Sequence, residues 1–256
     1  MKKVILVKLG GSLITDKTKP FTTRPEVITR IAHEVALGLK TNKFHLVIGN
    51  GGGSFPHTLA SQYETIKGFG PIADSAAKLN RIIVQALINE GINASSINPS
   101  STIIARGGQI KEFYLKSLLG LLKIGITPVV YGDIVLDEEN NFSIISTEKL
   151  LSYIALELKK LKYNIQSVIY CTQTDGVLDK NQQTIRSITP KNYPELSGFF
   201  YNIKGFDVTG GMDHKIKESL SLAQKGVPSV IINGLKKDNL KKALLGEKVE
   251  GTIIHE

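Results

Sequence analysis

The chain has 256 residues, of which 41% are hydrophobic and 21% charged, the composition of an ordinary globular protein. At about 150 residues per domain this length allows one or two domains, and no internal repeat or linker divides it, so we predict a single domain over 1–256. Cys171 is the only cysteine, which excludes a disulfide framework. The five histidines have no cysteine partners at metal-ligand spacing, which argues against a structural zinc site.

The net charge of +9 first suggests a polyanionic partner, since basic surfaces bind nucleic acids and membranes. However, 27 of the 32 basic residues are lysine and only five are arginine, the residue that base and phosphate recognition favours. The lysines are also scattered along the chain. We therefore favour a solvated lysine-rich surface and predict no nucleic-acid partner, with a polyanion-binding protein as the weakest alternative.

The N-terminal segment carries only a short apolar run, residues 4–7, which ends at Lys8. No apolar run approaches the roughly 20 residues of a membrane span. We therefore expect a cytoplasmic protein without a membrane partner.

Apolar runs and amphipathic stretches alternate along the chain. Residues 3–9 predict a strand, and Pro25 opens a helix in which Val27, Ile31 and Val35 follow the helical period. Further strands are expected over 44–48, 128–131, 168–172, 229–232 and 252–254, further helices over 73–89, 148–161 and 212–224, and a hairpin joining 134–136 to 142–145. This alternation predicts an α/β protein, a three-layer αβα sandwich around a mainly parallel open sheet.

Three glycine-rich turns fall where such a sheet binds ligands, at the carboxyl ends of strands or the start of a helix. They are Lys-Leu-Gly-Gly-Ser at 8–12, Gly-Asn-Gly-Gly-Gly-Ser at 49–54 and Asp-Val-Thr-Gly-Gly at 207–211. Glycine lets the backbone approach an anion closely, so the three turns together predict a phosphate site. The site is not a P-loop, a dinucleotide fingerprint or a nucleophile elbow, because none of these patterns is completed.

The order of motifs resembles the amino acid kinase superfamily. These motifs are residues 8–17 (KLGGSLITDK), 51–57 (GGGSFPH), 131–133 (YGD), 174–177 (TDGV), 207–211 (DVTGG) and 251–254 (GTII). Within the superfamily, the ITDK segment and the histidine that closes the second turn resemble the isopentenyl phosphate kinases. The resemblance implies transfer of the ATP γ-phosphoryl group to isopentenyl phosphate or a close alkyl monophosphate, with Mg²⁺ arriving with ATP, and a homodimer.

Roles follow from the resemblance, position by position. It implies that Lys8, Lys17 and His57 are catalytic, with Lys8 between the two phosphates and Lys17 stabilising the transferring group. Implied ATP contacts are Lys8, Leu9, Gly10, Gly11, Ser12, Gly53, Gln173, Asp175, Gly176, Gly211 and Lys215. Implied acceptor contacts are Gly52, His57 and the backbone of Thr147, with His57 holding the acceptor phosphate. No resident metal site is expected, although Asp175 or Glu148 could act indirectly on Mg²⁺.

The residue types suit this chemistry. An acceptor phosphate is already largely anionic near neutral pH, since its second pKa is about 6, so no general base is required. The protein has to hold two anions together against their repulsion. Burying an ammonium such as that of Lys8 at the end of an apolar strand costs free energy unless the ammonium pairs with an anion. A histidine beside a dianion would have a raised pKa. Lys17 and Lys215, taken alone, also fit ordinary surface lysines.

The acceptor's apolar part requires an apolar wall. On the helix predicted over 73–89, the candidates are Ala76, Ala77, Ile83, Ala86 and Leu87, although core packing is the better explanation for most of them.

Three positions depart from the family pattern: Pro56 replaces a glycine, Ser-Thr-Glu-Lys at 146–149 replaces Ser-Gly-Asp-Asp, and Gln173 replaces an aspartate. Two alternatives therefore stay open, a kinase of a phosphonate antibiotic such as fosfomycin, and a catalytically silent nucleotide-binding member of the superfamily.

Overall fold

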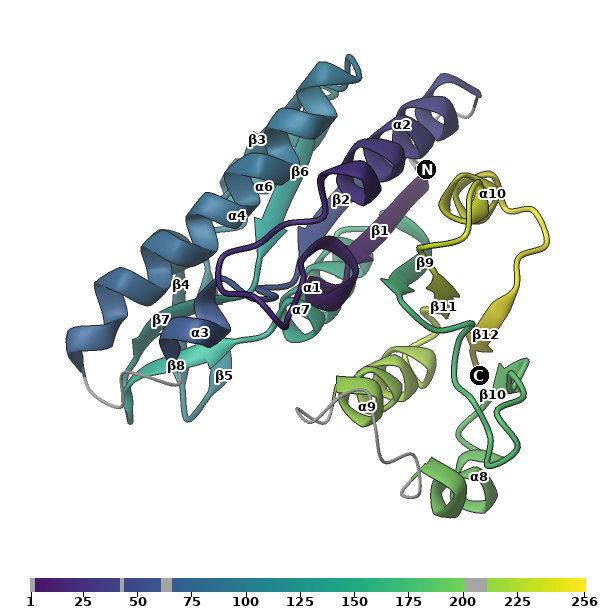
Figure 1. Cartoon of the computed structure of the whole chain (residues 1–256). Coiled ribbons are helices and arrows are strands. Elements are labelled where there is room, and N and C mark those ends of the chain that lie inside the picture. Colours follow the sequence, from purple (N-terminus) through teal and green to yellow (C-terminus); the bar gives the residue numbers. More distant parts are fainter. Residues whose placement is uncertain (1–2, 42–43, 61–65, 201–210) are drawn as a thin grey trace.

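A computed structural model describes residues 3–41, 44–60, 66–200 and 211–256 (Figure 1). Its main sheet has eight strands, in the order β10 (Ser187–Ile188), β12 (Gly251–Ile254), β11 (Ser229–Asn233), β9 (Asn164–Thr172), β1 (Lys3–Leu9), β2 (His45–Asn50), β6 (Thr127–Tyr131) and β3 (Ala94–Ser96). Every neighbouring pair is parallel except β11 and β12. The prediction of a mainly parallel sheet is confirmed.

Helices cover both faces of this sheet. Residues of β1 alternate between two cores: Ile5 and Val7 face one side, and Val4 and Leu6 face the other. On the first side lie α1 (Gly11–Ile14), α2 (Pro25–Thr41), α4 (Phe69–Asn89) and α10 (Asn239–Leu245). On the second lie α6 (Lys116–Lys123), α7 (Thr147–Lys160) and α9 (Gly211–Ala223). The predicted three-layer αβα sandwich is therefore confirmed.

A second sheet of four strands was not predicted beyond its hairpin. Its order is β5 (Gln109–Phe113), β4 (Ile103–Arg106), β7 (Asp133–Asp137) and β8 (Asn141–Ile145), and the β7–β8 hairpin is the predicted one. Asp137 connects the turn between β4 and β5 with the turn between β7 and β8. Its carboxylate accepts the N–H groups of Gly108 at 2.7 Å and of Glu139 at 2.9 Å. Half-exposed polar strands such as β5 lack the apolar run that marks a buried strand.

The remaining elements are short. They are α3 (Pro56–Ala60), the 3₁₀ turn η1 (Ile66–Gly68), α5 (Pro99–Thr102) and α8 (Tyr193–Phe200). Of the described residues, no helix combines the length and the apolar character that crossing a membrane requires.

Candidate active site

A cavity of about 710 Å³ opens at the carboxyl ends of β1, β2 and β9, where the first two glycine turns meet. Twelve of the predicted site residues line it: Lys8, Gly10, Gly11, Ser12, Lys17, Gly52, Gly53, His57, Thr147, Gln173, Gly176 and Lys215. Leu9 and Asp175 do not: Leu9 is buried in the core, and Asp175 directs its carboxylate to Lys236. Gly211 begins α9, directly before the lining residue Met212. Residues 207–210 of the third glycine turn lie outside the described residues.

The first two glycine turns pack backbone against backbone. A Cβ on Gly11 would lie 2.4 Å from the Gly53 nitrogen, and one on Gly53 would lie 2.2 Å from the Thr15 hydroxyl. Gly53 also has a φ of +55°, which side chains other than glycine rarely adopt. These contacts explain the glycines structurally, and they leave bare backbone at the cavity wall, where an anion can approach closely.

The histidine lies beside the second turn. His57 belongs to α3, its side chain is exposed to the cavity, and its Nε2 is 3.8 Å from the position of a Cβ on Gly52. Pro56, the first residue of α3, fits this place because a helix start needs no N–H donor there. A Cβ on Gly52 would lie 2.3 Å from the Pro56 ring, so this departure from the family pattern is accommodated by Gly52.

The electrostatic centre of the cavity is Glu148, for which the sequence suggested only an indirect action on Mg²⁺ and not its contacts with two lysines. Its Oε1 forms an ion pair with the Lys8 ammonium and lies 3.5 Å from the Lys215 Nζ. All three side chains are buried. Burial raises the pKa of the Glu148 carboxyl, but the charges of Lys8 and Lys215 outweigh burial and lower it to about 2. One carboxylate therefore holds two ammonium groups side by side.

This arrangement fits a nucleotide triphosphate. Two ammonium groups against one carboxylate leave a net positive charge of one, which a phosphate chain can neutralise while the glycine turns supply a close approach. Lys17, exposed at the cavity rim, adds a further positive charge. Within the described part of the chain, no three His, Cys, Asp or Glu side chains gather as a metal site.

Thr147 fills the position where the family pattern has glycine. Its hydroxyl donates to the carbonyl of Asn50 at 2.8 Å, and it is only 2% exposed. Ser146 caps α7 by accepting the N–H of Lys149 at 3.2 Å. The threonine side chain is therefore turned into the protein.

An apolar wall lines one end of the cavity. It is formed by Pro56, Ala60, Ile72, Ile134, Ile144 and Ile145. The helix candidates named from sequence are not among them: Ile83, Ala86 and Leu87 pack in the core, and neither Ala76 nor Ala77 lines the cavity. Of α4, it is Ile72, one residue before the predicted start of the helix, that reaches the cavity.

A buried carboxyl lies next to this wall. Asp133 is 2% exposed, and burial raises the pKa of its carboxyl to about 7, although N–H groups of Ile134 at 2.9 Å and Ser100 at 3.2 Å oppose the rise. The folded protein therefore keeps this proton up to about pH 7, whereas the unfolded chain loses it near its ordinary pKa of about 4.

The raised pKa predicts a pH-dependent stability. The stabilisation from protonated Asp133 is fully present below the unfolded pKa of about 4, decreases by up to about 1.4 kcal/mol per pH unit as the pH rises from about 4 to about 7, and is lost above the folded pKa. Urea unfolding at several pH values gives the slope of the free energy of unfolding against pH, and Asp133→Asn should lack the part of this slope that Asp133 contributes. Asp74→Asn, in an exposed ion pair of α4, should keep the wild-type slope. Equal slopes in the wild type and Asp133→Asn would contradict the prediction.

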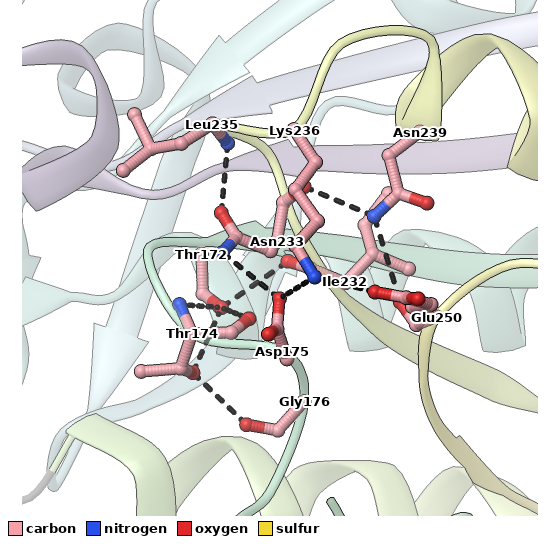
Figure 2. Close-up of polar contacts among 10 residues, drawn as sticks. All are labelled: Thr172, Thr174, Asp175, Gly176, Ile232, Asn233, Leu235, Lys236, Asn239 and Glu250. Atoms are coloured by element: carbon pink, nitrogen blue, oxygen red, sulfur yellow. Dashed lines mark hydrogen bonds and ion pairs between the residues drawn. The ribbon is translucent and has the colours of Figure 1, made fainter.

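Two loops also line the cavity, and Figure 2 shows the polar contacts between them. The loop after β9 contributes Gln173, Thr174 and Gly176, and the segment after β11 contributes Leu235. Asp175 lies between the two, and it accepts the side-chain amide of Asn233 at 3.0 Å.

Comparison with known proteins agrees with the fold and the glycine turns. The family model described as the amino acid kinase family matches residues 3–233. The chain belongs to the amino acid kinase family.

Its relatives include isopentenyl phosphate kinases. The one from Methanothermobacter thermautotrophicus is 36% identical, with 98% of each chain covered, and the one from Methanocaldococcus jannaschii is 34% identical, with 97% of each covered. A solved structure of an isopentenyl phosphate kinase superposes with a TM-score of 0.82 at 34% identity and covers 98% of this chain and 100% of that one.

Proposed function

We propose that this chain is an ATP-dependent kinase that transfers the γ-phosphoryl group to isopentenyl phosphate, giving isopentenyl diphosphate and ADP. The observation that carries the proposal is that one cavity is lined by the first two glycine turns, by two lysines that Glu148 holds, and by His57. Relatives of the same length, named isopentenyl phosphate kinases, support the choice of acceptor.

The lysines and glycines would bind the nucleotide phosphates. Lys8 and Lys215 face the triphosphate, the turns at 8–12 and 51–53 allow its close approach, and Mg²⁺ enters with ATP to neutralise part of its charge. An acceptor phosphate oxygen forms the new bond to the γ-phosphorus as the bond to the β-phosphate oxygen breaks. The electron pair of that bond leaves with ADP, and no protein group has to remove a proton.

The acceptor would lie between His57 and the apolar wall. His57, Gly52 and the Thr147 backbone face its phosphate, and Ile72, Ile134 and Ile145 face its hydrocarbon part. A charged imidazole beside a dianion is stabilised, so bound acceptor favours protonated His57.

His57→Ala tests the acceptor site. We expect kcat/KM for isopentenyl phosphate to fall about 10²-fold, the cost of a lost charge-assisted donor, while the KM for ATP changes less than about twofold. Steady-state kinetics with each substrate varied would measure both. His33→Ala, which removes an exposed histidine paired with Glu90, is the matched control. An unchanged kcat/KM for the acceptor in His57→Ala would reject this role.

An ATP-consumption screen tests the reaction itself, with isopentenyl phosphate, dimethylallyl phosphate, fosfomycin and N-acetylglutamate as acceptors. The proposal predicts the highest kcat/KM for isopentenyl phosphate. Turnover of fosfomycin alone would favour the phosphonate kinase, and ATP binding without turnover of any acceptor would favour the silent member of the family.

We further propose a cytoplasmic homodimer in which the whole chain forms one amino acid kinase-like domain. Support for the dimer comes from the family resemblance. Support for the location comes from the single cysteine, Cys171, which is buried and forms no disulfide framework.

A further inference from the structure

The cavity wall at the end away from His57 consists of two loops that leave neighbouring strands. β9 and β11 are parallel, with Thr172 opposite Asn233, so the loops after them emerge side by side. Thr174 and Gly176 of the first loop and Leu235 of the second line the cavity. Leu235 is 41% exposed, an apolar surface presented to the cavity.

The first loop is folded on itself and on β12. The Thr172 hydroxyl donates to the Ile232 carbonyl at 3.2 Å and accepts the N–H of Thr174 at the same distance. The Thr174 hydroxyl donates to the carbonyl of Gly176 at 2.9 Å (Figure 2). Gly176 has a φ of +96°, and a Cβ there would lie 2.5 Å from the Thr252 hydroxyl. These contacts fix the shape of the first loop, but none of them reaches Leu235 on the second loop.

Lys236 supplies the link between the loops. Its ammonium lies 2.9 Å from the Asp175 carboxylate on the first loop and also pairs with Glu250, just before β12 (Figure 2). Asn233 adds two bonds, one to Asp175 at 3.0 Å and one from the N–H of Leu235 at 2.9 Å. The residue next to Lys236 in the chain is the cavity-lining Leu235, so holding Lys236 also holds Leu235.

We propose that Lys236 is a positioning residue for the nucleoside part of ATP, acting through Asp175 and Leu235. The inference rests on the proposed function for the identity of the nucleotide. The triphosphate faces Lys8 and Lys215, so the nucleoside extends toward the two loops, where Leu235 offers an apolar surface to a planar base. Asp175 then acts as a support for the loop, and its carboxylate need not touch the nucleotide.

An exposed ion pair adds little to folding stability, commonly less than about 1 kcal/mol, so this role should appear in binding. The test is calorimetric binding of ADP, which needs no acceptor and therefore reads out even if isopentenyl phosphate is not the substrate. We expect Lys236→Met to raise the Kd for ADP five- to tenfold, and Lys236→Arg to stay within about twofold of the wild type. In turnover assays Lys236→Met should raise the KM for ATP with kcat and the acceptor KM nearly unchanged.

Lys111→Met is the matched control. Lys111 also bridges two carboxylates, Glu138 at 2.6 Å and Glu112 at 3.8 Å, with a similar exposure, but on the second sheet away from the two loops. It should leave the Kd for ADP unchanged. A wild-type Kd in Lys236→Met, or an equal rise in Lys111→Met, would overturn the inference. Absence of ADP binding by the wild type would overturn both it and the proposed function.

Discussion

Replacing Lys17 by alanine is expected to lower kcat about 10²- to 10³-fold, the effect of removing one preorganised charge-stabilising donor. Lys17 lies in the loop after α1, which folds back through the bridge between Thr15 and Thr23. The loop also rests on the second glycine turn, since the N–H of Thr22 donates to the Ser54 hydroxyl at 3.2 Å. This anchoring holds the ammonium at the cavity rim without burying it.

The loop provides its own control. Lys19 is two residues away, exposed, and does not line the cavity, so Lys19→Ala should retain nearly wild-type kcat. Rapid-quench measurement of a single turnover separates the chemical step from product release. Near-normal single-turnover rates in Lys17→Ala would remove this lysine from the chemistry.

Glu148→Gln is expected to have the largest effect on stability. It leaves the buried ammonium groups of Lys8 and Lys215 without their shared carboxylate, and removing one partner of a buried ion pair costs on the order of 3–5 kcal/mol. ATP phosphates can replace the lost negative charge, so ATP should bind at least as tightly as in the wild type and stabilise the variant more strongly. We expect kcat to fall at least tenfold because the lysines are no longer held in place.

Urea unfolding with and without ATP measures the first effect, and steady-state kinetics the second. Glu157→Gln is the matched control, since Glu157 lies on the same helix α7 but pairs with the exposed Lys160. The free energy of unfolding of Glu157→Gln should differ from that of the wild type by less than about 1 kcal/mol. Wild-type stability and kcat in Glu148→Gln would contradict the assigned role of Glu148.

Much of the fold was predictable because its signals are local. The apolar run of β1 and the stripe of α2 mark a strand buried on both faces and an amphipathic helix, and both begin where predicted. The first two glycine turns come directly after strands, so a parallel sheet places both at one edge, and they meet because β1 and β2 are neighbours. The strands β4 and β5 escaped prediction because they are short and half-exposed, and much of their stabilisation comes from pairing within the second sheet.

The contacts within the site that the sequence does not predict are long-range ones. Glu148 is 140 positions from Lys8, and nothing in its local sequence indicates that two lysines converge on it. Helical periodicity identifies the buried residues in the middle of α4 without showing what they face, so the sequence alone does not locate the apolar wall. Ile134 and Ile145 come instead from the hairpin, which lies beside the cavity only after the second sheet has formed.

Phosphorus NMR of a reaction with ATP and isopentenyl phosphate tests the central claim most directly. The proposed transfer predicts that the acceptor's single phosphorus resonance is replaced by two coupled resonances of a diphosphate, with one ADP formed for each. Release of ADP with inorganic phosphate and an unchanged acceptor resonance, or no reaction at all, would contradict it.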